Sequence, residues 1–260
     1  MAMTTTAMKT TAAAPFLIVE TGQPVASMRR HGSFAHWIRC AAGLRHRQTV
    51  AVDVVNAHGG AATALPSADE FAGVIVSGSG AMVTQRLDWS EYTAHWLRDA
   101  AEAGVPVFGI CYGHQLLAHA LGGEVGDNPR GREMGTIAID RLAAADGDPL
   151  FGVVPARFDA QATHLQTVLR PPTGATVLAT SAQDDCHAFC WGRSRIGAAA
   201  WGVQFHPEFS AGHMRGYIRA RADALQREGF DAQRLERQVG AAPAARRILR
   251  RFVRLAAMAG

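Results

Sequence analysis

Short apolar runs alternate with amphipathic segments along the first half of the chain. Between the first two runs, apolar residues recur at i, i+3, i+4 and i+7, which predicts a helix over Ser33–Ala42. A second helix is predicted from about Ser90 to Ala103, where Asp88-Trp-Ser-Glu91 has the pattern of a capping box. A third helix is expected to end at Gly122-Gly123, because glycine is favoured where a helix terminates. The runs with the length and composition of buried strands are Phe16–Glu20, Val50–Val55, Gly73–Ser77 and Val105–Ile110.

This alternation predicts an α/β fold, with a doubly wound, mostly parallel sheet flanked by helices. The stretch from Met134 to Phe205 holds several shorter strand-like pieces, which we expect to be partly antiparallel. We therefore divide the chain into an N-terminal segment expected to be disordered (1–14), one domain (15–210) and a C-terminal helical extension packed on it (211–260).

The C-terminal extension contains two arginine-rich segments with a helical pattern, Ala211–Glu228 and Ala244–Ala257. In the second, Leu249, Phe252 and Val253 share one face by their spacing. One interpretation is a helix that docks a partner or binds RNA. We favour a helix that packs on the domain through its apolar face and leaves its basic face in solvent, because amphipathic surface helices are common.

Composition narrows the function classes only slightly. The 260 residues include 26 Lys and Arg against 22 Asp and Glu, a net charge of +4, and Lys9 is the only lysine. Basic residues do not interleave with aromatic ones as in proteins that stack nucleic-acid bases, so no nucleic-acid partner is expected. No apolar run is long enough to span a membrane, and the N-terminus lacks the apolar core of a secretory signal. We therefore expect a cytoplasmic protein whose thiols stay reduced.

The strand-like run Val105–Ile110 ends in a turn with a cysteine at its apex, Gly109-Ile-Cys-Tyr-Gly113, and a helix pattern follows at once. This is the thiol counterpart of a nucleophile elbow. A helix N-terminus beside Cys111 favours the thiolate, and glycines on either side relieve the crowding of a sharp turn. The alternative is a buried structural cysteine, which most free cysteines are.

A second strand-like run ends in Gln204-Phe-His-Pro-Glu208. A cysteine nucleophile needs a base that takes and returns its proton, and the base needs a third group to orient it. His206 and Glu208 supply this pair, although they can meet Cys111 only in space. The other cysteines (Cys40, Cys186 and Cys190) lack metal-ligand spacing, so neither a metal nor a cofactor is expected.

Together with Arg132-Glu-Met-Gly135, these two blocks resemble those of class I glutamine amidotransferases, most closely the glutaminase domains of GMP synthases and their free-standing relatives. The resemblance runs from about Phe16 to Phe209. It implies Cys111 as nucleophile, His206 as base and Glu208 as its orienting partner.

The resemblance also implies further site residues. Gln115 matches a position that contacts bound glutamine, and Thr163-His164 matches a segment near the α-amino and α-carboxylate groups of the substrate. The backbone N–H groups of an oxyanion hole fall at Tyr112 and in the loop around Gly78 and Ser79. This loop departs from the family pattern Ser-Gly-Gly-Pro, because it reads Ser77-Gly-Ser-Gly80. Glycine in place of proline predicts a hole that is less preorganised.

These features predict an amidohydrolase that acts on a γ-glutamyl amide, with a small-molecule substrate and glutamine as its main candidate. Two alternatives stay open: hydrolysis of a γ-glutamyl peptide or conjugate, and a non-catalytic regulatory member of the family. Only about 50 residues follow the triad, and no phosphate-binding loop of the type G-x-x-x-x-G-K-[ST] occurs. We therefore expect ammonia either to pass to a separate synthetase partner or to be released.

Overall fold

The computed structural model describes residues 13–57 and 65–259, so nearly all of the N-terminal segment 1–14 lies outside the described residues. Within the described ranges the strands are β1 (Phe16–Glu20), β2 (Thr49–Asp53), β3 (Gly73–Val76), β4 (Val107–Ile110), β5 (Glu124–Asp127), β6 (Glu133–Arg141), β7 (Arg157–His164), β8 (Gln166–Arg170), β9 (Thr176–Thr180), β10 (Ala188–Trp191) and β11 (Ala200–Val203).

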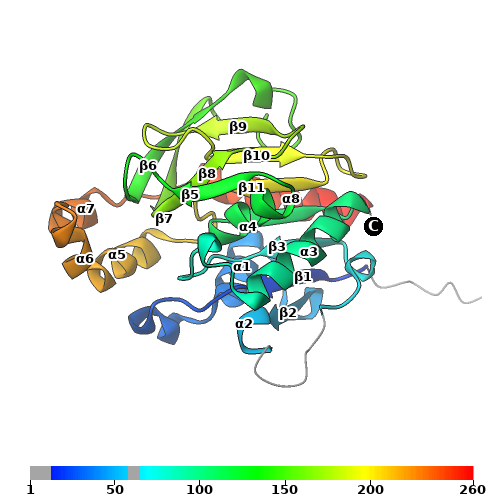
Figure 1. The fold of residues 1–260 in the computed structure, drawn as a ribbon, viewed down its shortest axis with the longest axis horizontal. Coiled ribbons are helices and arrows are strands. Elements are labelled where there is room, and N and C mark those ends of the chain that lie inside the picture. The colour runs from blue at the N-terminus through cyan, green and yellow to red at the C-terminus, as the bar shows by residue number, and fades with distance from the viewer. Residues whose placement is uncertain (1–12, 58–64, 260) are drawn as a thin grey trace, which may run out of the picture.

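Nine of these strands form one sheet in the order β2-β1-β3-β4-β11-β10-β9-β6-β7 (Figure 1). Neighbours from β2 to β11 are parallel, whereas those from β11 to β7 are antiparallel. Strands β5 and β8 pair separately. The α/β fold class expected from the sequence is confirmed, and the antiparallel strands come from the segment that was expected to supply them.

Helices cover both faces of the sheet because side chains alternate along each strand. The helices are α1 (Phe34–Ala42), α2 (Val54–Ala57), α3 (Asp88–Glu102), α4 (Tyr112–Ala120), α5 (Ala211–Ala220), α6 (Ala222–Arg227), α7 (Ala232–Gln238) and α8 (Pro243–Ala259). Phe16 and Ile18 of β1 join one buried cluster with α1 and α8, while Leu17 and Val19 join another with α3 and α4. The result is three layers, with the sheet in the middle.

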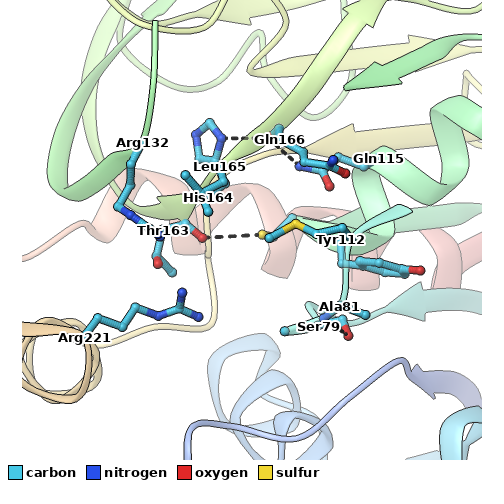
Figure 2. A pocket seen from close by; sticks show the side chains of 13 residues that line it. Ser79, Ala81, Tyr112, Gln115, Arg132, Thr163, His164, Leu165, Gln166 and Arg221 are labelled. Atoms are coloured by element: carbon cyan, nitrogen blue, oxygen red, sulfur yellow. Dashed lines mark hydrogen bonds between the residues drawn. The ribbon is translucent and has the colours of Figure 1, made fainter. Parts of the chain in front are cut away.

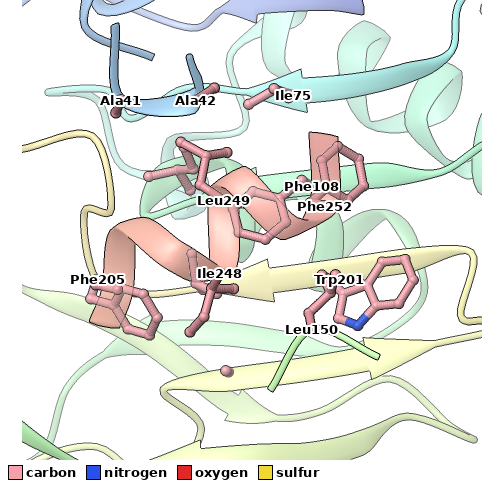
Figure 3. Close-up of a cluster of buried hydrophobic side chains, with 14 of the residues drawn as sticks. Ala41, Ala42, Ile75, Phe108, Leu150, Trp201, Phe205, Ile248, Leu249 and Phe252 are labelled. Carbon is pink, nitrogen blue, oxygen red and sulfur yellow. The ribbon is translucent and has the colours of Figure 1, made fainter. Parts of the chain in front are cut away.

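The apolar face of α8 is part of the core. Phe252 is fully buried, and the centroid of its ring lies 5.2 Å from that of Phe108 and 6.2 Å from that of Trp201 (Figure 3). Ile248 and Leu249 of the same face are also fully buried. The apolar face predicted for this helix is therefore the face that packs on the sheet.

Two local predictions in the N-terminal half are wrong. Strand β2 stops at Asp53, because the carboxylate of Asp53 accepts hydrogen bonds from the backbone N–H groups of Val55 and Asn56 and turns the chain into α2. The capping box at Asp88-Trp-Ser-Glu91 does not form, since α3 already includes Asp88 and no side chain caps its N-terminus. Instead, the Glu91 carboxylate pairs with His119 and Arg86.

The first C-terminal segment, Ala211–Glu228, is helical as its pattern predicted, but in two pieces. It breaks at Arg221 into α5 and α6, and a further helix, α7, follows. These three short helices gather at one end of the molecule (Figure 1). Met214, Tyr217 and Leu225 bury their side chains in a third apolar cluster with Trp37 of α1.

Candidate active site

Cys111 sits at the tight junction between β4 and α4. Its backbone has φ 52° and ψ −102°, a left-handed conformation that is strained for any residue other than glycine. Both flanking glycines are needed for close approach. A Cβ on Gly109 would lie 2.4 Å from the carbonyl oxygen of Gly113, and a Cβ on Gly113 would lie 2.6 Å from that of Val76. The elbow expected from the sequence is thus built into the backbone.

His206 and Glu208 follow β11, which lies beside β4 in the sheet. The Nδ1–H of His206 donates a 2.8 Å hydrogen bond to Oε1 of Glu208, and both side chains are buried. A Cβ placed on Gly78 would lie 3.1 Å from Cε1 of His206 and 3.8 Å from Cβ of Cys111. The imidazole of His206 and the side chain of Cys111 therefore both border the Gly78 backbone.

The charges of this group favour an ion pair. Burial alone would raise the pKa of the Cys111 thiol, but the charge of His206, together with that of His164, lowers this pKa overall. Burial lowers the pKa of His206, yet the charges of Glu208 and Cys111 raise it well above its usual range. Thiolate and imidazolium are the forms that these shifts favour.

The loop after β3 carries two of the expected oxyanion residues, Gly78 and Ser79. Its base is held by Thr21, whose N–H donates to Oγ of Ser77 at 3.0 Å and whose hydroxyl donates to the carbonyl of Gly78 at 3.2 Å. The Oγ of Ser79 accepts from the N–H of Ala81 at 3.1 Å. These hydrogen bonds hold both the base of the loop and Ser79. The third expected residue, Tyr112, opens α4, where backbone N–H groups have no partner within the helix.

Gln115 and Thr163 line the same pocket as Cys111 (Figure 2). The Nε2 of Gln115 donates to the carbonyl of Gln166 at 2.7 Å and to Oε1 of Gln204 at 2.8 Å. Both amide protons are thereby used, and the carbonyl oxygen stays available to a ligand. The carbonyl oxygen of Thr163 lies 3.9 Å from Sγ of Cys111, and its buried hydroxyl has no partner among the described residues.

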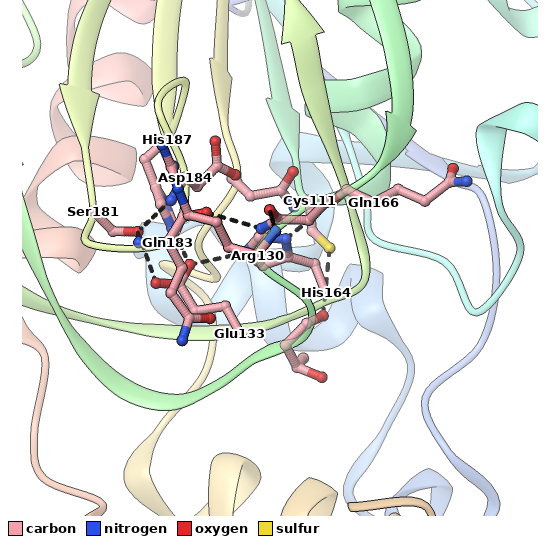
Figure 4. A network of polar contacts seen from close by, with 12 residues as sticks. Cys111, Arg130, Glu133, His164, Gln166, Ser181, Gln183, Asp184 and His187 are labelled. Atoms are coloured by element: carbon pink, nitrogen blue, oxygen red, sulfur yellow. Dashed lines mark hydrogen bonds and ion pairs between the residues drawn. The ribbon is translucent and has the colours of Figure 1, made fainter. Parts of the chain in front are cut away.

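His164 also borders the pocket, but its ring is held in a buried polar network (Figure 4). Its Nε2–H donates to Oε2 of Glu133 at 2.9 Å, and Nδ1 lies 3.0 Å from the carbonyl of Gln166. Because both nitrogens face oxygen acceptors, the arrangement favours the doubly protonated, positively charged ring. Burial lowers its pKa, but the Glu133 carboxylate raises the pKa overall.

Sequence reasoning missed the rest of this network. His187 donates to Oε2 of Glu133 at 2.7 Å, and Ser181 donates to Oε1 at 2.7 Å. Glu133, His164 and His187 are the one group of potential metal ligands found close together in the described parts of the chain. Their contacts of 2.7–2.9 Å are ordinary hydrogen-bond lengths, which fit protons between the atoms.

The two arginines that line the pocket, Arg132 and Arg221, were given no role in the sequence interpretation. Arg132 lies in a recognisable block, so it could have been found. Arg221 lies in an arginine-rich stretch without a motif, and nothing local distinguishes it. No helix within the described ranges is both long and apolar enough to cross a membrane.

Comparison with known proteins connects this site to one family. The family model for class I glutamine amidotransferases matches residues 30–222. A GMP synthase from Aeropyrum pernix is 40% identical over 146 residues, which are 56% of this chain and 25% of that protein. One of the GMP synthase subunits from Methanocaldococcus jannaschii is 34% identical over 144 residues, 55% of this chain and 68% of that protein.

Two further relatives bear on the function and on the fold. A γ-glutamyl-L-1-hydroxyisopropylamide hydrolase from a Pseudomonas species is 29% identical over 169 residues, 61% of this chain and 54% of that protein. A glutamine amidotransferase crystal structure from Thermotoga maritima superposes with a TM-score of 0.70 at 21% identity, covering 94% of this chain and 99% of that one. The matched region spans only about a quarter of the length of the Aeropyrum synthase.

Proposed function

The chain belongs to the class I glutamine amidotransferase family, and on that premise we propose that it hydrolyses the γ-amide of glutamine through a cysteinyl thioester, releasing glutamate and ammonia. The observation that carries the proposal is the buried His206–Glu208 pair, which borders Gly78 together with Cys111, and the lowered pKa of the Cys111 thiol. Lowered thiol pKa values mark reactive cysteines, whereas burial without such partners raises them.

In the first half of the reaction, the Cys111 thiolate attacks the γ-carbonyl carbon and forms a carbon–sulfur bond. The resulting oxyanion accepts hydrogen bonds from the backbone N–H groups of Tyr112 and of the Gly78–Ser79 loop. The tetrahedral intermediate collapses as the carbon–nitrogen bond breaks. The His206 imidazolium gives its Nε2 proton to the departing nitrogen, which leaves as ammonia.

In the second half, neutral His206 takes a proton from water, and the resulting hydroxide attacks the thioester. Glutamate leaves as the carbon–sulfur bond breaks, and the thiolate–imidazolium pair is restored. Glu208 keeps the Nδ1 proton in place throughout, so that Nε2 is the atom that exchanges protons with substrate and water.

The remaining pocket residues position the substrate in this proposal. The free carbonyl oxygen of Gln115 and the unpartnered hydroxyl of Thr163 supply polar contacts to the glutamyl group. The charged ring of His164 sits behind Thr163 and favours the thiolate of Cys111. The similarity to a separate GMP synthase subunit in Methanocaldococcus supports a second protein, a synthetase, as the acceptor of ammonia.

A second candidate is a hydrolase of γ-glutamyl conjugates, in which an alkylamine replaces ammonia as the leaving group. The similarity to the Pseudomonas hydrolase favours it, because that match covers more of this chain than the synthase matches do. The chemistry at Cys111 is the same in both cases. The two candidates differ only in the product that accompanies glutamate, ammonia or amine.

The test compares ammonia release from glutamine with amine release from γ-glutamylethylamide, using the full chain. Cys111→Ala should abolish both, and mass spectrometry of the wild type under turnover should detect a γ-glutamyl adduct on Cys111. Cys190→Ala is the matched control, since burial raises the pKa of that thiol to about 11 and it should form no adduct. Activity of Cys111→Ala near that of the wild type would disprove the mechanism.

A further inference from the structure

Two guanidinium groups border the pocket that contains Cys111. Arg132 precedes β6, and Arg221 stands at the break between α5 and α6. In Figure 2 they reach toward Thr163 from opposite sides, across the pocket from Ser79 and Tyr112. The pocket that they border is also lined by Gln115 and Thr163.

Arg132 already has an anionic partner. Its Nε and Nη2 donate to the two carboxylate oxygens of Glu228 at 2.6 Å and 2.9 Å, and its side chain is 5% exposed. Glu228 follows α6, so this bidentate pair fixes the C-terminal extension against the pocket rim. Among the residues that the structure describes, Nη1 of Arg132 has no hydrogen-bond partner.

Arg221 has no carboxylate partner within the described ranges. Its Nε is buried without a hydrogen bond, and its guanidinium lies 5.9 Å from the centroid of the Tyr217 ring. Burial and the charge of Arg132 lower its pKa, but arginine keeps its proton in proteins. A half-buried cation next to a second cation is unfavourable unless an anion joins them.

The position of Arg221 depends on the helix break. Its backbone has φ −113° and ψ 12°, and its N–H still bonds to the carbonyls of Tyr217 and Ile218 at the end of α5. A continuous helix over 211–228 would give this residue regular helical geometry. The break therefore sets the position from which its side chain reaches the pocket.

We propose that Arg221, assisted by Arg132, binds a carboxylate of the substrate. The inference rests on the proposed hydrolysis of γ-glutamyl amides, whose substrates carry an α-carboxylate and, in some conjugates, a second carboxylate on the leaving group. A planar guanidinium with free donors matches this group bidentately. The C-terminal extension then contributes directly to substrate selection, beyond its packing on the domain.

The experiment measures binding in the Cys111→Ala background, where turnover is blocked. Calorimetry compares glutamine with its α-amide, and γ-glutamylglycine with γ-glutamylethylamide. In each pair only one carboxylate differs. With Arg221 present, the carboxylate ligand of one pair should bind at least about tenfold more tightly, as a charge-assisted bidentate contact implies. The pair that shows the preference identifies which carboxylate is bound.

Arg221→Gln should abolish this preference, and Arg221→Lys should keep part of it because the charge remains. Arg227→Gln is the control, since it removes the same charge from the exposed side of α6. An unchanged preference in Arg221→Gln, or no binding of any of the four ligands, would overturn the subsite. Failure of the proposed function looks different: the wild type would release neither ammonia nor amine while the preference for the carboxylate persisted.

Discussion

A single methyl group added at Gly78 should slow catalysis without unfolding the protein. The backbone at Gly78 is not left-handed, so alanine is allowed there. Its Cβ, however, would lie 3.1 Å from Cε1 of His206, closer than an ordinary van der Waals contact. The ring cannot yield freely, because it is tied to Glu208 at 2.8 Å and stacked on Phe209 with centroids 4.1 Å apart.

The expected decrease in kcat follows from how far the His206 ring must move. The clash requires a displacement of a few tenths of an ångström. Misplacing a reacting group by 1 Å costs about 100-fold in rate, so this smaller shift should lower kcat by about fourfold to tenfold. The melting temperature of Gly78→Ala should stay within about 2–3 °C of the wild type, because a loss of about 1 kcal/mol corresponds to that shift in a chain of this size.

Gly80→Ala is the matched control in the same loop. A Cβ at Gly80 would meet no atom within 4 Å, and the position is not left-handed. This variant removes the backbone freedom of glycine but leaves His206 untouched, so its kcat should equal or exceed that of the wild type. Ammonia release under saturating glutamine measures both variants. Equal losses in the two would show that loop flexibility, and not the position of His206, sets the rate.

Other changes test the remaining parts of the site and the fold. His206→Ala should lower kcat more than Glu208→Gln, because the first removes the base and the second only weakens its orientation. The reverse order would contradict the role of His206 as the base. Phe252→Ala should cost about 3–5 kcal/mol of stability, seen as a lower melting temperature, whereas exposed Arg254→Ala should not. Because the pKa of Cys111 is lowered, its side chain should stay a thiolate as the pH falls through the range in which an ordinary thiol takes up a proton. Its alkylation by iodoacetamide should therefore slow only at lower pH. A decline in the alkylation rate centred near pH 8.5 would contradict the ion pair. Free glutamine should be a poor substrate for the isolated chain, with kcat/KM below about 10⁴ M⁻¹s⁻¹, because Gly80 allows the oxyanion loop more conformations than a proline would. Efficient turnover without a partner would contradict this.

Local patterns predicted the elements where burial alone decides them. Phe16–Glu20 is a strand with the predicted bounds, and Ser33 caps the helix that begins at Phe34. The patterns failed where a polar side chain had several possible partners. Glu91 could cap its own helix or pair with His119 on another, and only the packed structure brings His119 within reach.

The site residues fall into the same two groups: some lie in short sequence motifs, and others are brought together only by the fold. Cys111 and His206 stand in motifs whose chemistry can be read from a few consecutive residues. The pairing of His164 and His187 with Glu133 joins β7, β6 and the segment before β10, and no short window contains it. The position of Arg221 depends on a break between two helices. The residues around it are all compatible with a helix, so the sequence did not indicate the break.

The order of strands in the sheet places the Cys111 thiol and the His206 imidazole near each other. Strand β11 enters beside β4 in parallel, with Val203 opposite Ile110, and the N–H of Cys111 donates to the carbonyl of Val203 at 2.8 Å. Both motifs therefore leave the sheet at the same edge, where the carboxyl ends of parallel strands place ligand-binding residues. The sequence marks each strand end but not which strands are neighbours, because that choice is made by contacts across the whole core. A variant that weakens the pairing of β11 with β4 should therefore lose activity and the lowered pKa of the Cys111 thiol together, since His206 follows β11.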